Sequence, residues 1–237
     1  MISAEEKLQV ENYLIWKKLP LDILLEVKDH MISQIEDCMN DERVGFEEAF
    51  SKVELSWRDN FSLTKYWMFF GHEKIPRIAK NIMKSKFNII LRKSFLLGLL
   101  FFGLSFLLIP LSGDFESYKA YFVLSNSLFL LAPILLYVFN FKNISYFKKD
   151  SKYKGRIFYT LYQKNLTLLI VCFLGTSQIV LKGGEGLFNV FVLKENVSMI
   201  LIIGLCAYRL FIYTFAIFGV FSFFEHKKAL KKIQFLN

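Results

Sequence analysis

The chain has 237 residues, a net charge of +9 and a hydrophobic content of 54%, with 27 phenylalanines. Its charge is uneven: residues 1–88 hold 13 basic and 15 acidic side chains, so the whole positive excess lies in the C-terminal part. Because that part is strongly apolar, anionic lipid headgroups are the expected partner of its basic residues, at about 1 kcal/mol each. This distribution argues against direct binding of nucleic acid.

Three short amphipathic helices are predicted first, over residues 3–18, 20–39 and 46–57. Ser3 and Glu6 fit a capping box, in which the serine side chain accepts a hydrogen bond from a helical amide and the glutamate returns one. The second helix opens with a proline, which is well tolerated at the first helical position. We expect these helices to share one small core in a cytoplasmic domain, residues 1–75.

Two further segments precede the most apolar part of the chain. Residues 61–70 are apolar but too short to cross a bilayer, so they either pack on the domain or lie in the headgroup layer, where Tyr66 and Trp67 are at home. Residues 76–93 form a basic amphipathic juxtamembrane helix. We expect this helix to run along the bilayer surface and then turn into the membrane.

Four apolar runs follow, at 94–111, 121–141, 157–181 and 197–224. A hydrocarbon layer of about 30 Å needs roughly 20 apolar residues in a helix. Each run is apolar all round, which a solvent-facing helix is not. A large soluble helical core is the alternative, and the number of runs argues against it. The predicted fold is therefore all-α: a four-span transmembrane bundle, residues 94–224, preceded by the small helical domain.

The distribution of lysine and arginine predicts the orientation of these spans. Basic clusters lie at 80–93, at 142–156 and in the tail, 225–237, whereas the other two loops are poor in positive charge. Since basic loops stay on the cytoplasmic side, four spans place all three clusters and both termini in the cytoplasm. Abundant Phe, Lys, Ile and Asn are typical of an AT-rich bacterial genome, so the expected location is a bacterial inner membrane.

Residues 19–57 carry a recognisable pattern. It consists of Leu19-Pro20, then Glu26 and His30, then Ile35-Glu36, then Gly45-Phe46-Glu47-Glu48-Ala49. This pattern resembles the N-terminal helical domain of HAAS or DUF1700-like bacterial multi-pass membrane proteins, and it departs from them after Ala49. The resemblance implies a signalling or interaction module, often encoded beside PadR-type regulators, and no catalytic residues. The polar side chains of the pattern, Glu26, His30, Glu47 and Glu48, form a candidate partner surface.

Arg209 is the most unusual residue of the membrane part, because it lies near the middle of the fourth run. An arginine there costs roughly 2.5–3.5 kcal/mol on insertion scales and needs a partner or a water-filled cavity. The candidate intramembrane polar site comprises Arg209, Asn126, Gln178 and Tyr213, with Asn126 the first choice of partner. Three interpretations stay open: a site for a polar ligand or ion, a structural hydrogen-bond hub, or a contact with a carboxylate of another subunit. Lys164 lies nearer the cytoplasmic end of its run and is expected to snorkel.

The sequence contains no phosphate-binding loop, nucleophile elbow or zinc-protease motif, so we expect no catalytic residues, cofactor or metal site. The preferred hypothesis is a non-enzymatic sensor or scaffold that presents its helical module to a cytoplasmic protein partner or a membrane subunit. The alternative is a small transporter or channel subunit with Arg209 in its pathway, which requires homo-oligomerisation. An intramembrane enzyme is a third possibility, for which no acid–base pair can be named.

Overall fold

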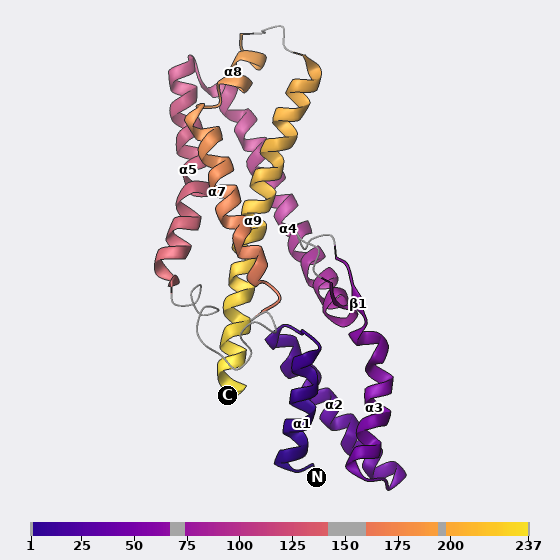
Figure 1. Ribbon diagram of the computed structural model, residues 1–237. Helices are drawn as coiled ribbons and strands as arrows, with labels where there is room; N and C mark the ends of the chain where they lie inside the picture. Colours follow the sequence, from indigo (N-terminus) through magenta and orange to yellow (C-terminus); the bar gives the residue numbers. More distant parts are fainter. Residues whose placement is uncertain (1, 67–73, 142–159, 194–197, 237) are drawn as a thin grey trace. The chain divides into compact units, whose positions relative to one another are not determined.

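The computed structural model describes residues 2–66, 74–141, 160–193 and 198–236 (Figure 1). Apart from a pair of two-residue strands, the regular elements in these ranges are helices. In chain order they are α1 (Ala4–Trp16), α2 (Leu21–Glu42), α3 (Phe46–Phe61), β1 (Leu63–Thr64), β2 (Ile75–Pro76), α4 (Arg77–Leu111), α5 (Phe115–Phe139), the 3₁₀ turn η2 (Gln163–Leu166), α7 (Thr167–Leu181), α8 (Glu185–Phe191) and α9 (Met199–Leu236).

The chain divides into two compact units. Unit 1 comprises residues 1–86, 147–164 and 225–237, and unit 2 comprises residues 87–146 and 165–224. Helices α4 and α9 each contribute residues to both units. The unit that holds the N-terminal helices is therefore larger than the predicted domain 1–75, because it also takes in a short segment before α7 and the end of α9.

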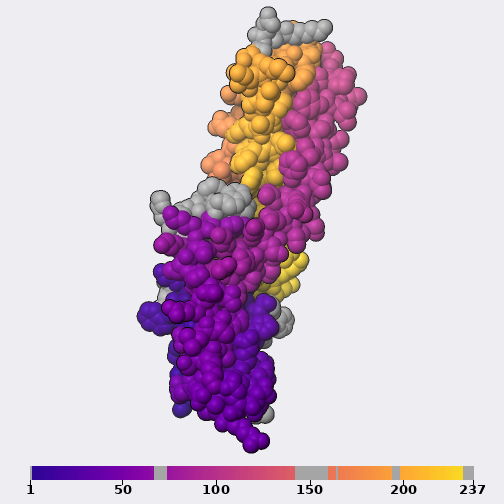
Figure 2. Space-filling model, turned by 90° about the vertical axis from the view of Figure 1, so that its right-hand side faces the viewer, coloured from indigo at the N-terminus to yellow at the C-terminus, as the bar shows by residue number. Residues whose placement is uncertain are grey.

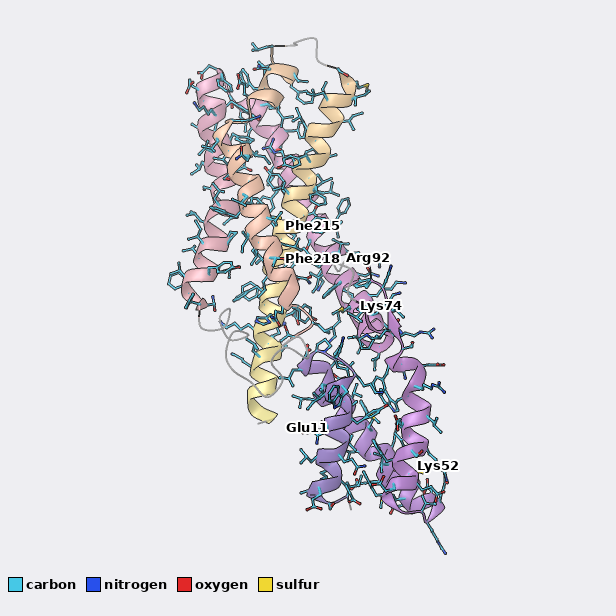
Figure 3. The ribbon with its side chains drawn as sticks, in the orientation of Figure 1. Glu11, Lys52, Lys74, Arg92, Phe215 and Phe218 are labelled. Atoms are coloured by element: carbon cyan, nitrogen blue, oxygen red, sulfur yellow. The ribbon has the colours of Figure 1, made fainter. Side chains whose placement is uncertain are left out.

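The core of unit 1 is formed by the three N-terminal helices. The predicted capping box is present: the Ser3 side chain accepts from the Glu6 amide, and the Glu6 carboxylate accepts from the Ser3 amide at 2.7 Å. Pro20 lies one position before α2, where its carbonyl oxygen accepts from the Leu24 amide at 2.8 Å. Most of the apolar side chains at helical spacing are buried, namely Leu14, Leu24, Val27, Met31, Ile35, Phe46, Ala49, Phe50 and Val53. In the first helix Leu8 and Trp16 are instead exposed. Lys28 pairs with Glu11 at 3.2 Å and Lys52 pairs with Glu48 at 2.9 Å; Glu11 and Lys52 are labelled in Figure 3.

The apolar stretch 61–70 is described only as far as Tyr66. Strand β1 pairs antiparallel with β2, with Leu63 opposite Pro76 and Thr64 opposite Ile75. Tyr66 itself is buried. Residues 61–66 therefore pack on unit 1, which is one of the two alternatives predicted for this stretch. Residues 67–70 lie outside the described residues.

Helix α4 corrects the prediction of a surface helix that turns into the membrane. Residues 77–111 form a single uninterrupted helix, so the basic segment and the first apolar run are parts of one element. The physical reason is that no proline or glycine lies between Pro76 and Gly98. Without either residue the helical hydrogen bonding continues, and a turn at residue 93 has no cause.

Three helices, α4, α5 and α9, are long and apolar enough to cross a membrane. Helices α7 and α8 together pass the same test, but they are bent by 52° at the intervening break, so the described helices provide up to four spans if this pair counts as one. The bend falls at Gly183 and Gly184, whose φ angles of +58° and +72° end α7. These helices identify a membrane protein.

The run predicted at 157–181 is α-helical only from Thr167 onward, and residues 157–159 lie outside the described residues. Residues 163–166 form a 3₁₀ turn instead. Polar side chains at 163–165 disfavour an apolar helix here, and the buried Asn165 amide donates to the Ser222 hydroxyl at 3.3 Å. The predicted tail, 225–237, continues α9 as far as Leu236.

Unit 2 exposes apolar side chains along its helices, including Leu96, Leu124 and Ile203. Figure 2 shows α9, coloured orange to yellow, at this surface. The interior of unit 2 contains aromatic contacts, such as the edge-on contact of Phe218 with Phe87, whose ring centroids lie 5.9 Å apart. Phe218 and the neighbouring Phe215 are labelled on α9 in Figure 3. Helices α4 and α9 approach closely at Gly98, where an added Cβ would lie 2.7 Å from the Thr214 hydroxyl. Small residues thus bring the helices together, as is common in membranes.

Candidate functional site

Arg209 is buried in unit 2, with only 4% of its surface exposed. Its Nε donates to the Tyr213 hydroxyl at 3.0 Å, one helical turn along α9. That hydroxyl donates to Asn126 Oδ1 on α5 at 2.5 Å. Asn126 was the predicted partner, and it is reached through Tyr213 rather than directly. The three residues form a polar chain that joins α9 to α5.

The plane of the Arg209 guanidinium is held by an aromatic ring. Its central carbon lies 4.3 Å from the centroid of the Phe122 ring. A cation over an aromatic face is attracted by the ring quadrupole, and the attraction is stronger where water is excluded. Together with the bond from Nε, this contact fixes both the position and the plane of the guanidinium.

The two terminal nitrogens of Arg209, Nη1 and Nη2, are buried and form no hydrogen bond within the described residues. The buried Tyr118 hydroxyl lies close to Arg209 and interacts with it both through its charge and as a weak hydrogen-bonding neighbour, although the contact falls outside the geometry of a full hydrogen bond. A buried donor left unsatisfied costs about 1–3 kcal/mol, and more when it is charged. Two parallel N–H groups of a guanidinium match the oxygens of a carboxylate or phosphate.

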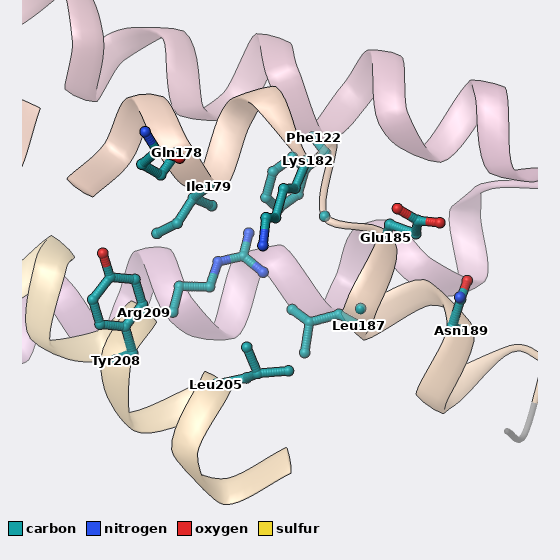
Figure 4. Close-up of a pocket in the computed structure, with 12 residues that line it drawn as sticks. Phe122, Gln178, Ile179, Lys182, Glu185, Leu187, Asn189, Leu205, Tyr208 and Arg209 are labelled. Carbon is teal, nitrogen blue, oxygen red and sulfur yellow. The ribbon is translucent and has the colours of Figure 1, made fainter. Parts of the chain in front are cut away.

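A cavity of about 540 Å³ lies beside this guanidinium (Figure 4). Its size is within the usual range of roughly 300–1,000 Å³ for small-molecule sites. Helices α5, α7, α8 and α9 supply its walls, through Phe122, Gln178, Ile179, Lys182, Gly184, Glu185, Gly186, Leu187, Asn189, Leu205, Tyr208 and Arg209. Lys182 and Glu185 are exposed, whereas Arg209 and Leu187 are buried. The cavity therefore has an arginine at its inner end and one charge of each sign near its rim.

The glycine pair between α7 and α8 shapes this cavity. A Cβ at Gly184 would lie 2.9 Å from two carbons of the Phe122 ring, and the φ angle of +72° would strain any other residue. After this turn the chain enters α8, where Leu187 and Phe188 are buried. Phe188 packs with Tyr118 and Phe122 in one cluster. The turn thus lets α8 cover the aromatic residues beside Arg209.

The predicted intramembrane residues are brought into one region. Arg209, Tyr213 and Asn126 are joined by hydrogen bonds, and Gln178 lies in the cavity wall. Sequence reasoning missed Lys182, Glu185 and Phe122. Lys182 directly precedes Gly183 and Gly184, and two adjacent glycines at the end of an apolar run were the available signal of a turn there. The side chain of Lys164 lies outside the described residues.

The candidate partner surface of unit 1 is exposed at all four positions. Glu26 and His30 lie on α2, and Glu47 and Glu48 lie in the first turn of α3. Glu47 accepts from the Gln9 amide at 3.3 Å, and Glu48 pairs with Lys52 at 2.9 Å. All four side chains are accessible from the surface of unit 1.

Unit 1 also contains a carboxylate in an unusual setting. Asp22 Oδ2 accepts from the Leu161 amide at 3.4 Å, while Oδ1 is buried and forms no hydrogen bond within the described residues. Desolvation by burial raises the pKa of Asp22 to about 6, against the opposing effects of the Leu161 amide and the charge of Lys86. A cavity of about 440 Å³ adjoins Asp22 and is also lined by Lys86, Tyr162, Glu225 and Lys228. Nearby, the Thr160 hydroxyl and His226 Nδ1 lie 2.7 Å apart.

Compared with known proteins, the chain matches no protein-family model, no curated protein and no solved structure. The resemblance of residues 19–57 to the HAAS group therefore stays a prediction.

Proposed function

We propose that this protein is a non-enzymatic membrane receptor, which binds an oxyanion at Arg209 in unit 2 and presents the helices of unit 1 to a protein partner. The observation that carries the proposal is the state of Arg209: its Nε and one face are occupied, while Nη1 and Nη2 lie buried beside a cavity without a hydrogen-bond partner in the described residues. A carboxylate or phosphate supplies the two acceptors that these nitrogens lack.

The proposed membrane arrangement has four spans, with α7 and α8 counted as one bent span. Both termini lie in the cytoplasm of a bacterial cell, following the basic clusters. In this arrangement the α7–α8 turn and its cavity lie toward the external face. The exposed acidic residues of α2 and α3 remain in the cytoplasm, where a protein partner can reach them.

Binding can be tested through Cys172, which is buried on α7 with 2% of its surface exposed. In a full-length C38S/C206S variant, a thiol-reactive fluorophore reports the thermal unfolding of unit 2. We expect 10 mM octanoate to raise the unfolding temperature and octanol to have no such effect. At 100 times Kd the stabilisation is about 2.7 kcal/mol, which corresponds to roughly 5–10 °C for a chain of this size.

The matched variants are Arg209→Gln and Arg92→Gln, since Arg92 is exposed on α4. The octanoate effect should disappear in the first and persist in the second. If octanoate, acetate and inorganic phosphate all stabilise Arg209→Gln as much as the parent, Arg209 does not bind an oxyanion and the proposal fails.

The receptor role has its own readout, because Trp16 and Trp57 lie in unit 1. Octanoate should change the tryptophan fluorescence of the full-length chain but not of Arg209→Gln. If fluorescence is unchanged while reconstituted vesicles take up labelled phosphate in an Arg209-dependent way, the chain is instead a transporter subunit.

A further inference from the structure

The walls of the Arg209 cavity indicate how its ligand enters. Helices α7 and α9 meet at Gly175, where an added Cβ would lie 2.5 Å from Ile212 Cδ1 and 3.3 Å from the Tyr208 hydroxyl. Further along α7, Gln178 and Ile179 form one wall of the cavity, while Leu205 and Tyr208 of α9 form another. Helices α7 and α9 are therefore in close contact at Gly175, and they are farther apart beside the cavity.

The residues that border this separation are of the kind that face lipid. Leu205 and Tyr208 are 40% and 47% exposed, although both line the cavity. Most of the exposed side chains on either side of them are apolar, with Leu201 on α9 and Leu174 and Leu181 on α7. The exposed polar side chains at this end of α7 are Gln178 and Lys182, which line the cavity itself. In a membrane the apolar side chains contact acyl chains rather than water. The opening between α7 and α9 therefore faces the hydrocarbon layer.

Depth along the helix agrees with this position. Arg209 follows Met199, the first residue of α9, by ten positions. At 1.5 Å per residue the guanidinium-bearing position lies roughly 15 Å along the helix from its end. That is near the inner boundary of the headgroup region, or within the hydrocarbon layer.

The charges of the cavity select the charge of the ligand. The ionised side chains that line it are Arg209, Lys182 and Glu185. Lys182 and Glu185 are exposed and opposite in sign, so the lining as a whole carries a net charge of +1. The buried Arg209 leaves one uncompensated positive charge at the inner end. A ligand with a single negative charge neutralises it.

We propose that the ligand is an amphiphilic monoanion that comes from the membrane, with its carboxylate or phosphate on Arg209 and its hydrocarbon chain lying between α7 and α9. This inference rests on the proposed oxyanion site and adds the chemical class and the route of entry. Fatty acids and singly charged phospholipids share this chemistry, and a free phosphate or short carboxylate shares only the headgroup.

The test uses the Cys172 reporter in the full-length chain, embedded in nanodiscs of phosphatidylcholine. Oleate is added as the membrane-borne probe, with oleyl alcohol as its uncharged match, and phosphatidylglycerol as a second lipid monoanion. Acetate and inorganic phosphate are the soluble probes. Both affinities are expressed against the free concentration in water. Because each methylene removed from water strengthens binding about fourfold, four such methylenes should make oleate bind at least 100-fold more tightly than acetate.

Leu205→Trp narrows the opening without touching the arginine, and Ile179→Trp does so from α7. Either variant should reduce the oleate-to-acetate ratio to below tenfold, because the bulkier side chain displaces the hydrocarbon chain from between the helices. Arg209→Gln should abolish both responses. If Leu205→Trp does not fold, Ile179→Trp provides the same test from the other helix.

The outcomes separate the two proposals. If oleate and acetate bind the parent chain equally, or if both tryptophan variants fold and bind oleate as the parent does, the lipid inference is wrong and the oxyanion site stands. If inorganic phosphate alone stabilises the chain through Arg209, the ligand is a soluble anion. If Arg209→Gln binds every probe as the parent does, the oxyanion site itself is wrong.

Discussion

In unit 1 most of the fully buried side chains are aliphatic, such as Leu14, Leu24 and Ile35, and most charged residues are exposed, with the buried carboxylate of Asp22 the exception described above. In unit 2 leucines are exposed along α4, α5 and α9, while polar side chains, Asn126 and Arg209 among them, are buried. The two units thus follow opposite rules. A water-facing unit gains stability by hiding apolar surface. A lipid-facing unit gains nothing from hiding it, and must satisfy its polar groups internally.

The largest effect is expected from a cavity in the core of unit 1. Leu24 is fully buried, so Leu24→Ala should lower the free energy of unfolding by about 2–5 kcal/mol, through lost burial and the space left behind. Urea unfolding of the full-length chain in detergent, followed by tryptophan fluorescence, measures it. Leu55→Ala is the control, since Leu55 is 64% exposed on α3. Equal losses in both variants would mean that the N-terminal helices do not share a core.

The second largest effect is expected from a charge placed on the exposed surface, and it should differ between the two units. Leu131 of α5 and Leu55 of α3 are both exposed. Leu131→Arg should raise the free energy of membrane insertion of α5 by roughly 2.5–3.5 kcal/mol, because the arginine must enter hydrocarbon. Leu55→Arg should change stability by no more than about 0.5 kcal/mol, because its surroundings are aqueous. Insertion of α5 in a microsomal glycosylation assay measures the first, and urea unfolding the second.

If Leu131→Arg inserts as efficiently as the parent sequence, α5 does not face lipid at this position. The exposure of apolar side chains in unit 2 and their burial in unit 1 could then not be explained by lipid around one unit and water around the other.

The smallest effect is a pH dependence that belongs to unit 1. Burial raises the pKa of Asp22 from its ordinary value to about 6. In the unfolded chain Asp22 loses its proton near pH 4, so between pH 4 and pH 6 the folded state binds the proton more tightly. Asp22 therefore contributes on the order of 2 kcal/mol to the free energy of unfolding. This contribution is fully present below pH 4 and is lost as the pH rises through 6.

Asp22→Asn keeps the shape of the side chain but does not titrate. The difference in unfolding free energy between this variant and the parent should therefore change between pH 4 and pH 7, as measured by urea unfolding in detergent. A constant difference over that range would contradict the raised pKa of Asp22. Lys86, Glu26, Glu225 and Lys228 line the same cavity and are unchanged in the variant, so the comparison isolates Asp22.

Local sequence signals predicted many of the helices, and long-range contacts decided where they were interrupted. The capping box at Ser3 and the left-handed turn at Gly183 involve only neighbouring residues, and both can be located from the sequence. The length of α7 could not be predicted from its apolar run alone. Its start at Thr167 follows the buried Asn165, whose partner Ser222 lies 57 positions away.

Some residues of the candidate site could likewise be identified from the sequence, and others could not. Arg209 could be identified from the sequence, because a charge inside an apolar run is unusual wherever the helix packs. The contribution of Phe122 could not be predicted, since a phenylalanine among 27 carries no local signal. Its role depends on α5 and α9 lying side by side. Lys182 and Glu185 follow the third apolar run in the sequence without any signal of a site, and the bend between α7 and α8 brings them to the cavity.

The sequence by itself determined that this protein has long apolar helices suited to a bilayer, an amphipathic N-terminal part and one deeply placed arginine. These properties depend on composition and on the 3.6-residue period, which every segment carries locally. Only the tertiary structure decided that Tyr213 links Arg209 to Asn126, and that two guanidinium nitrogens are left beside a cavity. Hydrogen bonds between helices depend on which faces meet, and that choice is made by the packing of the whole unit.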